Sequence, residues 1–229
     1  MNRTVTAMSF FLSVLVPIGA DAQLRVGMEN GHEYVDLGLS VKWATCNVGA
    51  KTPQGYGDYY AWGETTEKFF YYTWKTYKFR ADGDSTENVT FSKYNTDKSR
   101  GKIDNNKYLD EADDVARVQW GGNWRIPSYE DIQELIENCT WTWTTRKRVP
   151  GYLVTGKKSG YTDSYIFLPA AGYRSENMIY GEGKCGCYWS RSLDSRGCYN
   201  AFCLVFPLSI TEYNDGSRFY GQSVRPVCN

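Results

Sequence analysis

Four of the seven cysteines in this chain of 229 residues fall in one short stretch, KCGCYWSRSLDSRGCYNAFC, where thiols could act as nucleophiles or metal ligands. Cys185, Cys187, Cys198 and Cys203 match zinc in number and type, but C-x-C followed by C-x4-C is not the spacing of a zinc ribbon or knuckle. Disulfides or small buried side chains are favoured, although Cys185 and Cys187 are too close in sequence to favour a bond with each other. Because seven is odd, at least one thiol is free or pairs between molecules.

Acid–base chemistry has few candidates in the sequence. His32 is the single histidine, so a Ser-His-Asp or Cys-His mechanism would have to use it, and a solvated or edge-strand histidine is favoured instead. Asp113 and Asp114 are adjacent carboxylates, but neighbouring residues of a helix point in different directions. We therefore predict no catalytic residue, no metal and no cofactor, in a protein that is not an enzyme.

Calcium is a third possibility to weigh, because EYNDGS brings the oxygen donors Glu212, Asn214 and Asp215 together. The same residue types favour a β-turn through their backbone tolerance, and the turn is the favoured interpretation. The acidic run DEADD is likewise interpreted as the charged start of a helix.

The polar residues from Cys185 to Tyr220 are typical of a binding surface. Lysine, glutamine and methionine are absent from this stretch, and Ser, Arg, Asp, Asn, Tyr, Gly and Cys fill its polar positions. Tyrosine gives contact area at low entropic cost, while Ser, Gly and Asn give adaptable hydrogen bonds. We predict an outward, ligand-binding set of Arg191, Asp194, Arg196, Tyr199, Cys203, Tyr213, Asn214, Arg218 and Tyr220. The predicted framework beneath them is Trp189, Leu204, Phe206, Val224 and Pro226.

Composition limits the class of partner. Lys+Arg 26 balances Asp+Glu 26, which removes the electrostatic argument for nucleic acid or an anionic membrane. Aromatic residues make up 16% of the chain beside 22 glycines, and the mean hydropathy is −0.54. Short strands and structured loops are expected from such a composition, more than helix packing.

The N-terminus is typical of an exported protein. Basic Arg3 precedes the apolar run AMSFFLSVLVPIG and the small-residue site Ala20-Asp21-Ala22, so residues 1–22 are predicted to be a signal peptide. No stretch is long enough to predict a transmembrane helix. Residues 23–31 are predicted to form a short linker and residues 32–229 a single domain, located in the periplasm, at the cell surface or outside the cell.

The elements that must position these residues are short. Two strands with a Gly-Leu-Ser turn are predicted in HEYVDLGLSVKWATCNVGA, and residues 68–107 are predicted to be a long surface excursion. One helix is predicted in DEADDVARVQW, and a second one after Pro127 with Ser128 as N-cap and Asp131 in a capping box. Further strands are predicted at YLVTG, YIFLPAAGYR, CYWSRS, AFCLVF and GQSVRPV. The order predicts an α+β domain with an antiparallel sheet.

Six motifs carry a family resemblance: VDLGLSVKWATCNVGA, GDYYAWGET, WGGNWRIPSYEDIQEL, FLPAAGYR, YWSRS and GQSVRPVCN. In this order they resemble the major paralogous domain of Fibrobacter, from about His32 to Asn229. The resemblance implies a C-type-lectin-like fold with short antiparallel strands, two helices and long structured loops. The implied fold is akin to that of formylglycine-generating enzymes and of the variable proteins of diversity-generating retroelements. It implies no reaction.

Together these observations predict an exported, non-catalytic module that recognises a protein or glycan ligand through its C-terminal surface. Retroelement diversification of adenine-containing codons is an open possibility, because it yields the observed residue palette and would leave Trp189 and Glu212 as fixed positions. An oxidoreductase like the formylglycine-generating enzymes and a structural subunit of a cell-surface assembly are the alternatives.

Overall fold

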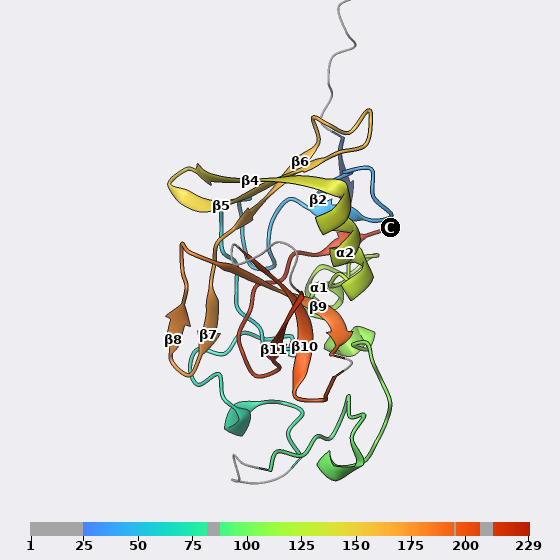
Figure 1. The fold of residues 1–229 in the computed structure, drawn as a ribbon, viewed down its shortest axis with the longest axis vertical. Helices are drawn as coiled ribbons and strands as arrows, with labels where there is room; N and C mark the ends of the chain where they lie inside the picture. Colours follow the sequence, from blue (N-terminus) through green and yellow to red (C-terminus); the bar gives the residue numbers. More distant parts are fainter. Residues whose placement is uncertain (1–24, 82–87, 195, 207–212) are drawn as a thin grey trace, which may run out of the picture.

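The computed structural model describes residues 25–81, 88–194, 196–206 and 213–229. The described chain is a mixed α+β structure with two α-helices and many short antiparallel strands in small sheets, which confirms the predicted class. Figure 1 shows the ribbon of β4 and β5 at one end of the molecule and the loops of residues 88–107 towards the other.

A four-stranded antiparallel sheet joins the beginning and the end of the described chain. Its order is β1 (Val26–Glu29), β2 (His32–Val35), β3 (Lys42–Ala44) and β12 (Val227–Cys228). The two strands predicted between residues 32 and 50 are therefore confirmed. The predicted linker 23–31 is wrong in part, because β1 pairs along its whole length with β2.

The C-terminal residues form a second sheet, in the order β11 (Tyr213–Ser217), β10 (Asn200–Phe206) and β9 (Gly186–Leu193). The β-turn favoured for EYNDGS is wrong, because Tyr213 to Ser217 pair with β10 as an extended strand. The backbone hydrogen bonds with β10 outweigh the turn preference of these residue types.

The third sheet consists of β4 (Cys139–Arg146), β5 (Val149–Gly156) and β6 (Tyr165–Pro169). A separate two-stranded hairpin follows, made of β7 (Tyr173–Ser175) and β8 (Met178–Tyr180). In Figure 1 this hairpin lies at the left, below the ribbon of β4 and β5.

The second predicted helix begins where its capping residues predict. In α2 (Tyr129–Asn138), the Ser128 hydroxyl accepts from the N–H of Asp131, and the Asp131 carboxylate accepts from the N–H of Ser128, so the capping box is confirmed. The predicted first helix instead divides into the 3-10 turn η3 (Glu111–Asp113) and α1 (Val115–Trp120). Asp114 separates them because its carboxylate caps α1.

The prediction of a surface excursion for residues 68–107 is wrong. The described part contains only the 3-10 turns η1 (Trp74–Thr76) and η2 (Lys98–Arg100) as regular helical structure. Its aromatic side chains nevertheless enter the main hydrophobic core, including Tyr72, Tyr77, Phe79, Phe91 and Tyr94. Aromatic burial holds this segment in place without a strand or a long helix.

None of the helices in the described ranges is both long enough and apolar enough to cross a lipid bilayer.

Candidate ligand-binding site

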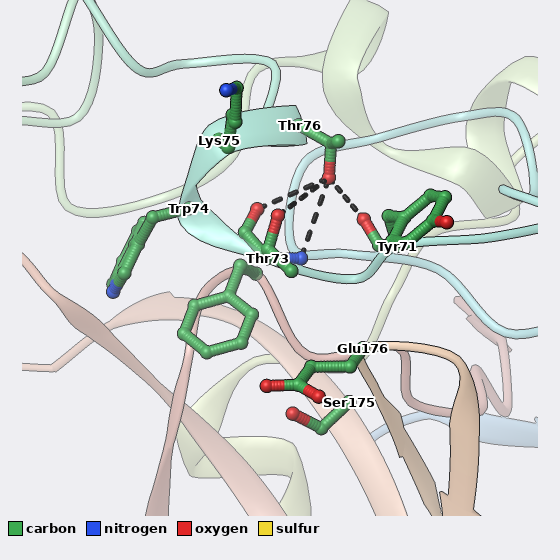
Figure 2. Close-up of a pocket in the computed structure, with 8 residues that line it drawn as sticks. Tyr71, Thr73, Trp74, Lys75, Thr76, Ser175 and Glu176 are labelled. Atoms are coloured by element: carbon green, nitrogen blue, oxygen red, sulfur yellow. Dashed lines mark hydrogen bonds between the residues drawn. The ribbon is translucent and has the colours of Figure 1, made fainter. Parts of the chain in front are cut away.

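A pocket of about 740 Å³ lies between η1 and the β7–β8 hairpin (Figure 2). Three aromatic rings form most of its wall, and the hydrophilic groups come from both sides. Its lining residues are Tyr71, Thr73, Trp74, Lys75, Thr76, Ser175, Glu176 and Phe219. A concave, mainly apolar site with a few polar groups is the usual form of a ligand pocket.

Trp74 is held rigidly at the wall of this pocket. Its ring makes edge contacts with Tyr77, Phe91, Tyr199 and Phe219, with centroid distances between 4.9 and 5.6 Å. These partners fix the indole by packing, while its half-buried position leaves a face for a ligand. Within the described residues, the indole N–H of Trp74 donates no hydrogen bond, so it too remains available.

The hydroxyl groups of the η1 turn are used inside the turn. The Thr76 hydroxyl donates to the Tyr71 carbonyl, lies 3.2 Å from the Thr73 carbonyl, and accepts from the N–H of Thr73 at 3.4 Å (Figure 2). Across the pocket, Figure 2 shows the Ser175 hydroxyl and the Glu176 carboxylate turned towards the Trp74 side, while Lys75 points away. The exposed Glu176 carboxylate forms no ion pair with any residue that the structure describes.

The two sides of the pocket are joined by backbone hydrogen bonds. The Tyr72 N–H donates to the Glu176 carbonyl at 3.0 Å, and the Glu176 N–H donates to the Tyr72 carbonyl at 2.9 Å. Tyr71 and Glu176 both lie in the left-handed region, with φ of 62° and 51°. Such conformations are uncommon for residues other than glycine and asparagine, so the local backbone is strained at the pocket mouth.

Exposed apolar side chains adjoin the lining residues of the pocket in the chain, and we call this set the rim. Phe69 is 81% exposed, Phe70 67% and Met178 60%, and Tyr71, Ile179 and Tyr180 are also exposed. The Tyr71 N–H donates to the Asn177 side chain at 3.0 Å, which brings the two parts of the rim together. Exposed apolar side chains next to a pocket are typical of an interaction surface.

Three of the residues predicted to face outward are instead buried: Asp194, Cys203 and Arg218. The prediction of outward display is wrong for them, because each side chain makes its contacts inside the protein. The Asp194 carboxylate receives the Arg196 guanidinium at 3.0 Å and the Arg196 N–H at 2.9 Å, so its charge is paired inside the protein. Cys203 lies in β10 opposite Trp189 and joins the main core.

Arg218 is fully buried and acts as an anchor for residues 68–107. Its guanidinium donates to the Tyr77 hydroxyl at 2.8 Å and to the carbonyls of Lys93, Tyr94 and Cys198 at 2.8 to 3.1 Å. The rings of Trp62, Tyr77, Phe91 and Tyr94 surround the charge at 4.6 to 5.9 Å. Carbonyl oxygens and ring faces replace the water that a buried cation loses.

Of the other predicted residues, Tyr199 and Tyr220 pack against the pocket residues Trp74 and Phe219, whereas Arg191 lies in a different place. Arg191 donates to the Leu109 carbonyl at 2.6 Å and lines a second cavity of about 570 Å³ with residues 105–111. Tyr199 lies under Arg100 at 4.9 Å, and Tyr220 packs on Tyr173 at 5.1 Å. Arg196 is exposed.

The predicted residues Tyr213 and Asn214 have their backbones in β11, and their side chains lie outside what the structure describes. Glu212, the third residue of the calcium candidate, also lies outside the described residues. Of the described ranges, no part gathers three or more side chains suited to a metal ion.

The three acid–base candidates, His32, Asp113 and Asp114, each contact other groups of the protein. His32 stacks on Trp120 at 3.8 Å, and burial lowers the pKa of the imidazole. Asp113 receives Lys78 at 2.7 Å and the Tyr94 hydroxyl at 2.6 Å, whereas Asp114 caps α1. The two carboxylates therefore have different partners, a lysine and a tyrosine for Asp113 and the backbone of α1 for Asp114.

Sequence reasoning missed Trp74 and Phe219 because the pocket joins residues 71–76, 175–176 and 219, which are far apart in the sequence. The available signal was the aromatic density of FFYYTWKTYKF at residues 69–79, which predicted a surface loop when read alone. A scan against protein-family models, a search of curated proteins and a search of solved structures each found no match.

Proposed function

We propose that this chain is an exported, non-catalytic recognition module that binds a protein partner through the pocket between η1 and the β7–β8 hairpin. The single observation that carries the proposal is the aromatic pocket, whose lining residues adjoin the exposed apolar side chains of residues 69–71 and 178–180 in the chain. A C-type-lectin-like fold and membership of the major paralogous domain family belong to the same proposal, with the six sequence motifs as their support.

A protein partner is favoured over a glycan because of the chemistry of the rim. Phe69, Phe70 and Met178 offer apolar surface with few hydrogen-bonding groups, and aromatic residues and methionine are enriched in the centres of protein interfaces. The complementary segment would insert one large apolar side chain beside Trp74. A hydrogen-bond donor or a positive charge next to that anchor would meet the Glu176 carboxylate.

Rigidity supports recognition by this pocket. Trp74 is fixed by four rings of the protein, so little side-chain freedom is lost when a ligand packs on it. Diversification of all nine predicted positions is not included in the proposal, because random substitution of the buried Arg218, Asp194 or Cys203 would vary the core.

The test is selection of a random peptide library on phage against the purified protein, followed by affinity measurements with the enriched peptides. We expect peptides that share a large apolar residue. Trp74→Ala should weaken their binding by about 2 kcal/mol or more, which is roughly 30-fold, because central aromatic residues dominate interface energies. Tyr71→Asn, which tolerates the left-handed backbone and leaves the core untouched, should weaken binding without loss of folding.

Trp143→Ala is the matched control, because Trp143 is an exposed tryptophan of β4 that does not line the pocket. It should bind the peptides as the natural protein does. Equal losses in Trp143→Ala and Tyr71→Asn would contradict the proposed site. A glycan array in parallel tests the ligand class, since glycan binding that depends on Tyr71 and Trp74, without peptide binding, would replace the protein partner by a saccharide.

A further inference from the structure

One edge of the third sheet is left without a neighbouring strand. β4 has eight residues and pairs with β5 on one side only. Within the described ranges, residues 141–145 form no isolated bridge and no backbone hydrogen bond with any element other than β5. β9 also lies at the end of its sheet, but bridges from Tyr188 and Ser192 to other segments cover it. An open edge such as that of β4 is a template for pairing with another chain.

The backbone groups that face the open edge follow from the pairing with β5. Pro150 of β5 lies opposite Thr145, and its carbonyl accepts from the Ala170 N–H at 2.9 Å, on the side of β6. Opposite residues of an antiparallel pair direct their backbone groups either both towards each other or both away, and the two arrangements alternate along the strand. The N–H and C=O groups of Trp141, Trp143 and Thr145 therefore point away from β5 to the open edge.

The side chains of β4 lack the features that usually prevent strand pairing. Residues 140–145 are all threonine or tryptophan, which favour strands, and they include no charged residue and no proline. β4 and β5 pair over the whole length of both strands without a bulge. Trp143 is 41% exposed, which is high for a tryptophan inside a strand. The edge is thus long, regular and uncharged.

The two ends of β4 carry opposite charge. α2 ends at Asn138, directly before β4, so the exposed Glu137 and the negative end of the helix dipole lie at the start of the strand. The turn that follows β4 carries Lys147 and Arg148, which are both exposed. Glu137, Lys147 and Arg148 form no ion pair with any residue in the described part of the chain. Figure 1 shows β4 running from α2 to this turn.

We propose that two copies of this chain form a dimer by antiparallel pairing of β4 with β4 around a two-fold axis at Trp143. Antiparallel pairing places the start of one β4 beside the end of the other, so Glu137 of each copy lies near Lys147 and Arg148 of the second copy. Parallel pairing would bring like charges together. The two-fold arrangement satisfies both charged ends at once, which favours a second copy over an unrelated extended peptide. No residue of β4 lines the pocket, so the dimer is independent of the proposed binding function.

The register follows from the directions of the backbone groups. With the axis at Trp143, this residue lies opposite its own copy and Trp141 lies opposite Thr145 of the second copy, so all the outward groups meet outward groups. An axis between two residues would place outward groups opposite inward ones. An axis at Thr142 would extend the pairing to Cys139, which is 1% exposed and directly follows α2.

Sedimentation over a range of protein concentrations tests the dimer. We expect a concentration-dependent dimer and no larger species, because the pairing uses the open edge of both copies. Trp143→Lys should weaken dimerisation at least about tenfold, because two positive charges would meet at the axis. Ile179→Lys is the matched control, since Ile179 is an exposed apolar residue of another strand, β8, and should leave the dimer unchanged.

Thr145→Pro tests the backbone without a new charge. It removes an N–H that points to the open edge and leaves the hydrogen bonds between β4 and β5 in place, so the monomer should fold, as circular dichroism checks. Its dimer should also be weakened. A natural protein that stays monomeric, or a dimer of normal strength in folded Thr145→Pro, would overturn the proposal. Loss of the dimer in Ile179→Lys instead would place the contact on the β7–β8 hairpin.

Exchange of charges tests the antiparallel orientation. Glu137→Lys and Lys147→Glu should each weaken the dimer about three- to tenfold, because an attraction that occurs twice becomes a repulsion or is lost. The double variant restores opposite charges between the copies and should recover most of the affinity. Additive losses in the double variant would show that Glu137 and Lys147 do not meet, and the antiparallel arrangement would be wrong.

Discussion

Arg218 and Phe219 are neighbours in the chain but belong to regions with opposite character. The Arg218 side chain is buried in a cage of rings and carbonyls, whereas Phe219 contributes to an open pocket. A charge lies inside and apolar surface lies outside, which reverses the usual distribution. The end of β11 therefore holds residues of the 68–107 segment on its inner side and contributes to the pocket on its outer side.

The largest expected effect comes from removal of the inner anchor. Arg218→Ala should lower the free energy of unfolding by about 3–5 kcal/mol, because it creates a cavity and leaves buried acceptors of Lys93, Tyr94 and Cys198 without donors. Urea denaturation measures this loss. Arg218→Lys keeps the charge but lacks the planar fork of donors, so it should also destabilise the protein, by a smaller amount.

Arg146→Ala is the control for this prediction, since Arg146 makes a ring contact with Tyr165 on the surface of the third sheet. A cation–ring contact at an accessible site contributes about 1 kcal/mol or less. If both alanine variants lose the same stability, Arg218 is not an anchor and the contrast between the two regions fails.

An intermediate effect on stability is expected for Asp113. Its carboxylate binds Lys78, Lys93 and Tyr94, which belong to the 68–107 segment. Burial opposes ionisation of this carboxyl, but hydrogen bonds from Lys78, Lys93 and Tyr94 outweigh it and lower its pKa. A lowered folded-state pKa stabilises the protein above the unfolded value of about 4, and this stabilisation is lost as the pH falls through the lower folded value. Stability should therefore decrease on acidification below about pH 4.

Asp113→Asn makes this prediction specific. At pH 7 the variant should lose about 1–3 kcal/mol, because Lys78 loses its ionic partner and Lys93 keeps only Asp110. Its stability should also depend less on pH between neutral and acidic solution than that of the natural protein, as followed by urea titrations at several pH values. Parallel pH curves for the two proteins would exclude a stabilising role for the ionised carboxyl.

The smallest expected effect on stability is at Glu176 in the pocket, where a substitution should stabilise the protein. Glu176→Gly should raise the free energy of unfolding by about 0.5–1 kcal/mol, because glycine accepts the φ of 51° without strain. The same variant should weaken binding of peptides that carry a donor beside the apolar anchor. Thermal unfolding and peptide affinity measured on one preparation test both parts, and a loss of stability would show that the Glu176 side chain supports the fold.

Local patterns in the sequence predicted local structure well. Ser128 and Asp131 define the start of α2, because capping hydrogen bonds form between residues three positions apart. The strands at residues 152–156 and 201–206 were recognisable from short apolar runs. β1 and β11 were not predicted, because polar and turn-forming residues there become strands through pairing with β2 and β10.

By itself, the sequence determined the α+β class, the position of α2 and a balanced charge that gives no electrostatic basis for nucleic-acid binding. Only the tertiary structure decided that Arg218 lies inside and that Trp74 and Phe219 share a pocket. The physical reason is the distance along the chain over which the deciding interactions act. Caps and alternation arise within a few residues, whereas burial of an arginine depends on rings and carbonyls that distant segments bring to it.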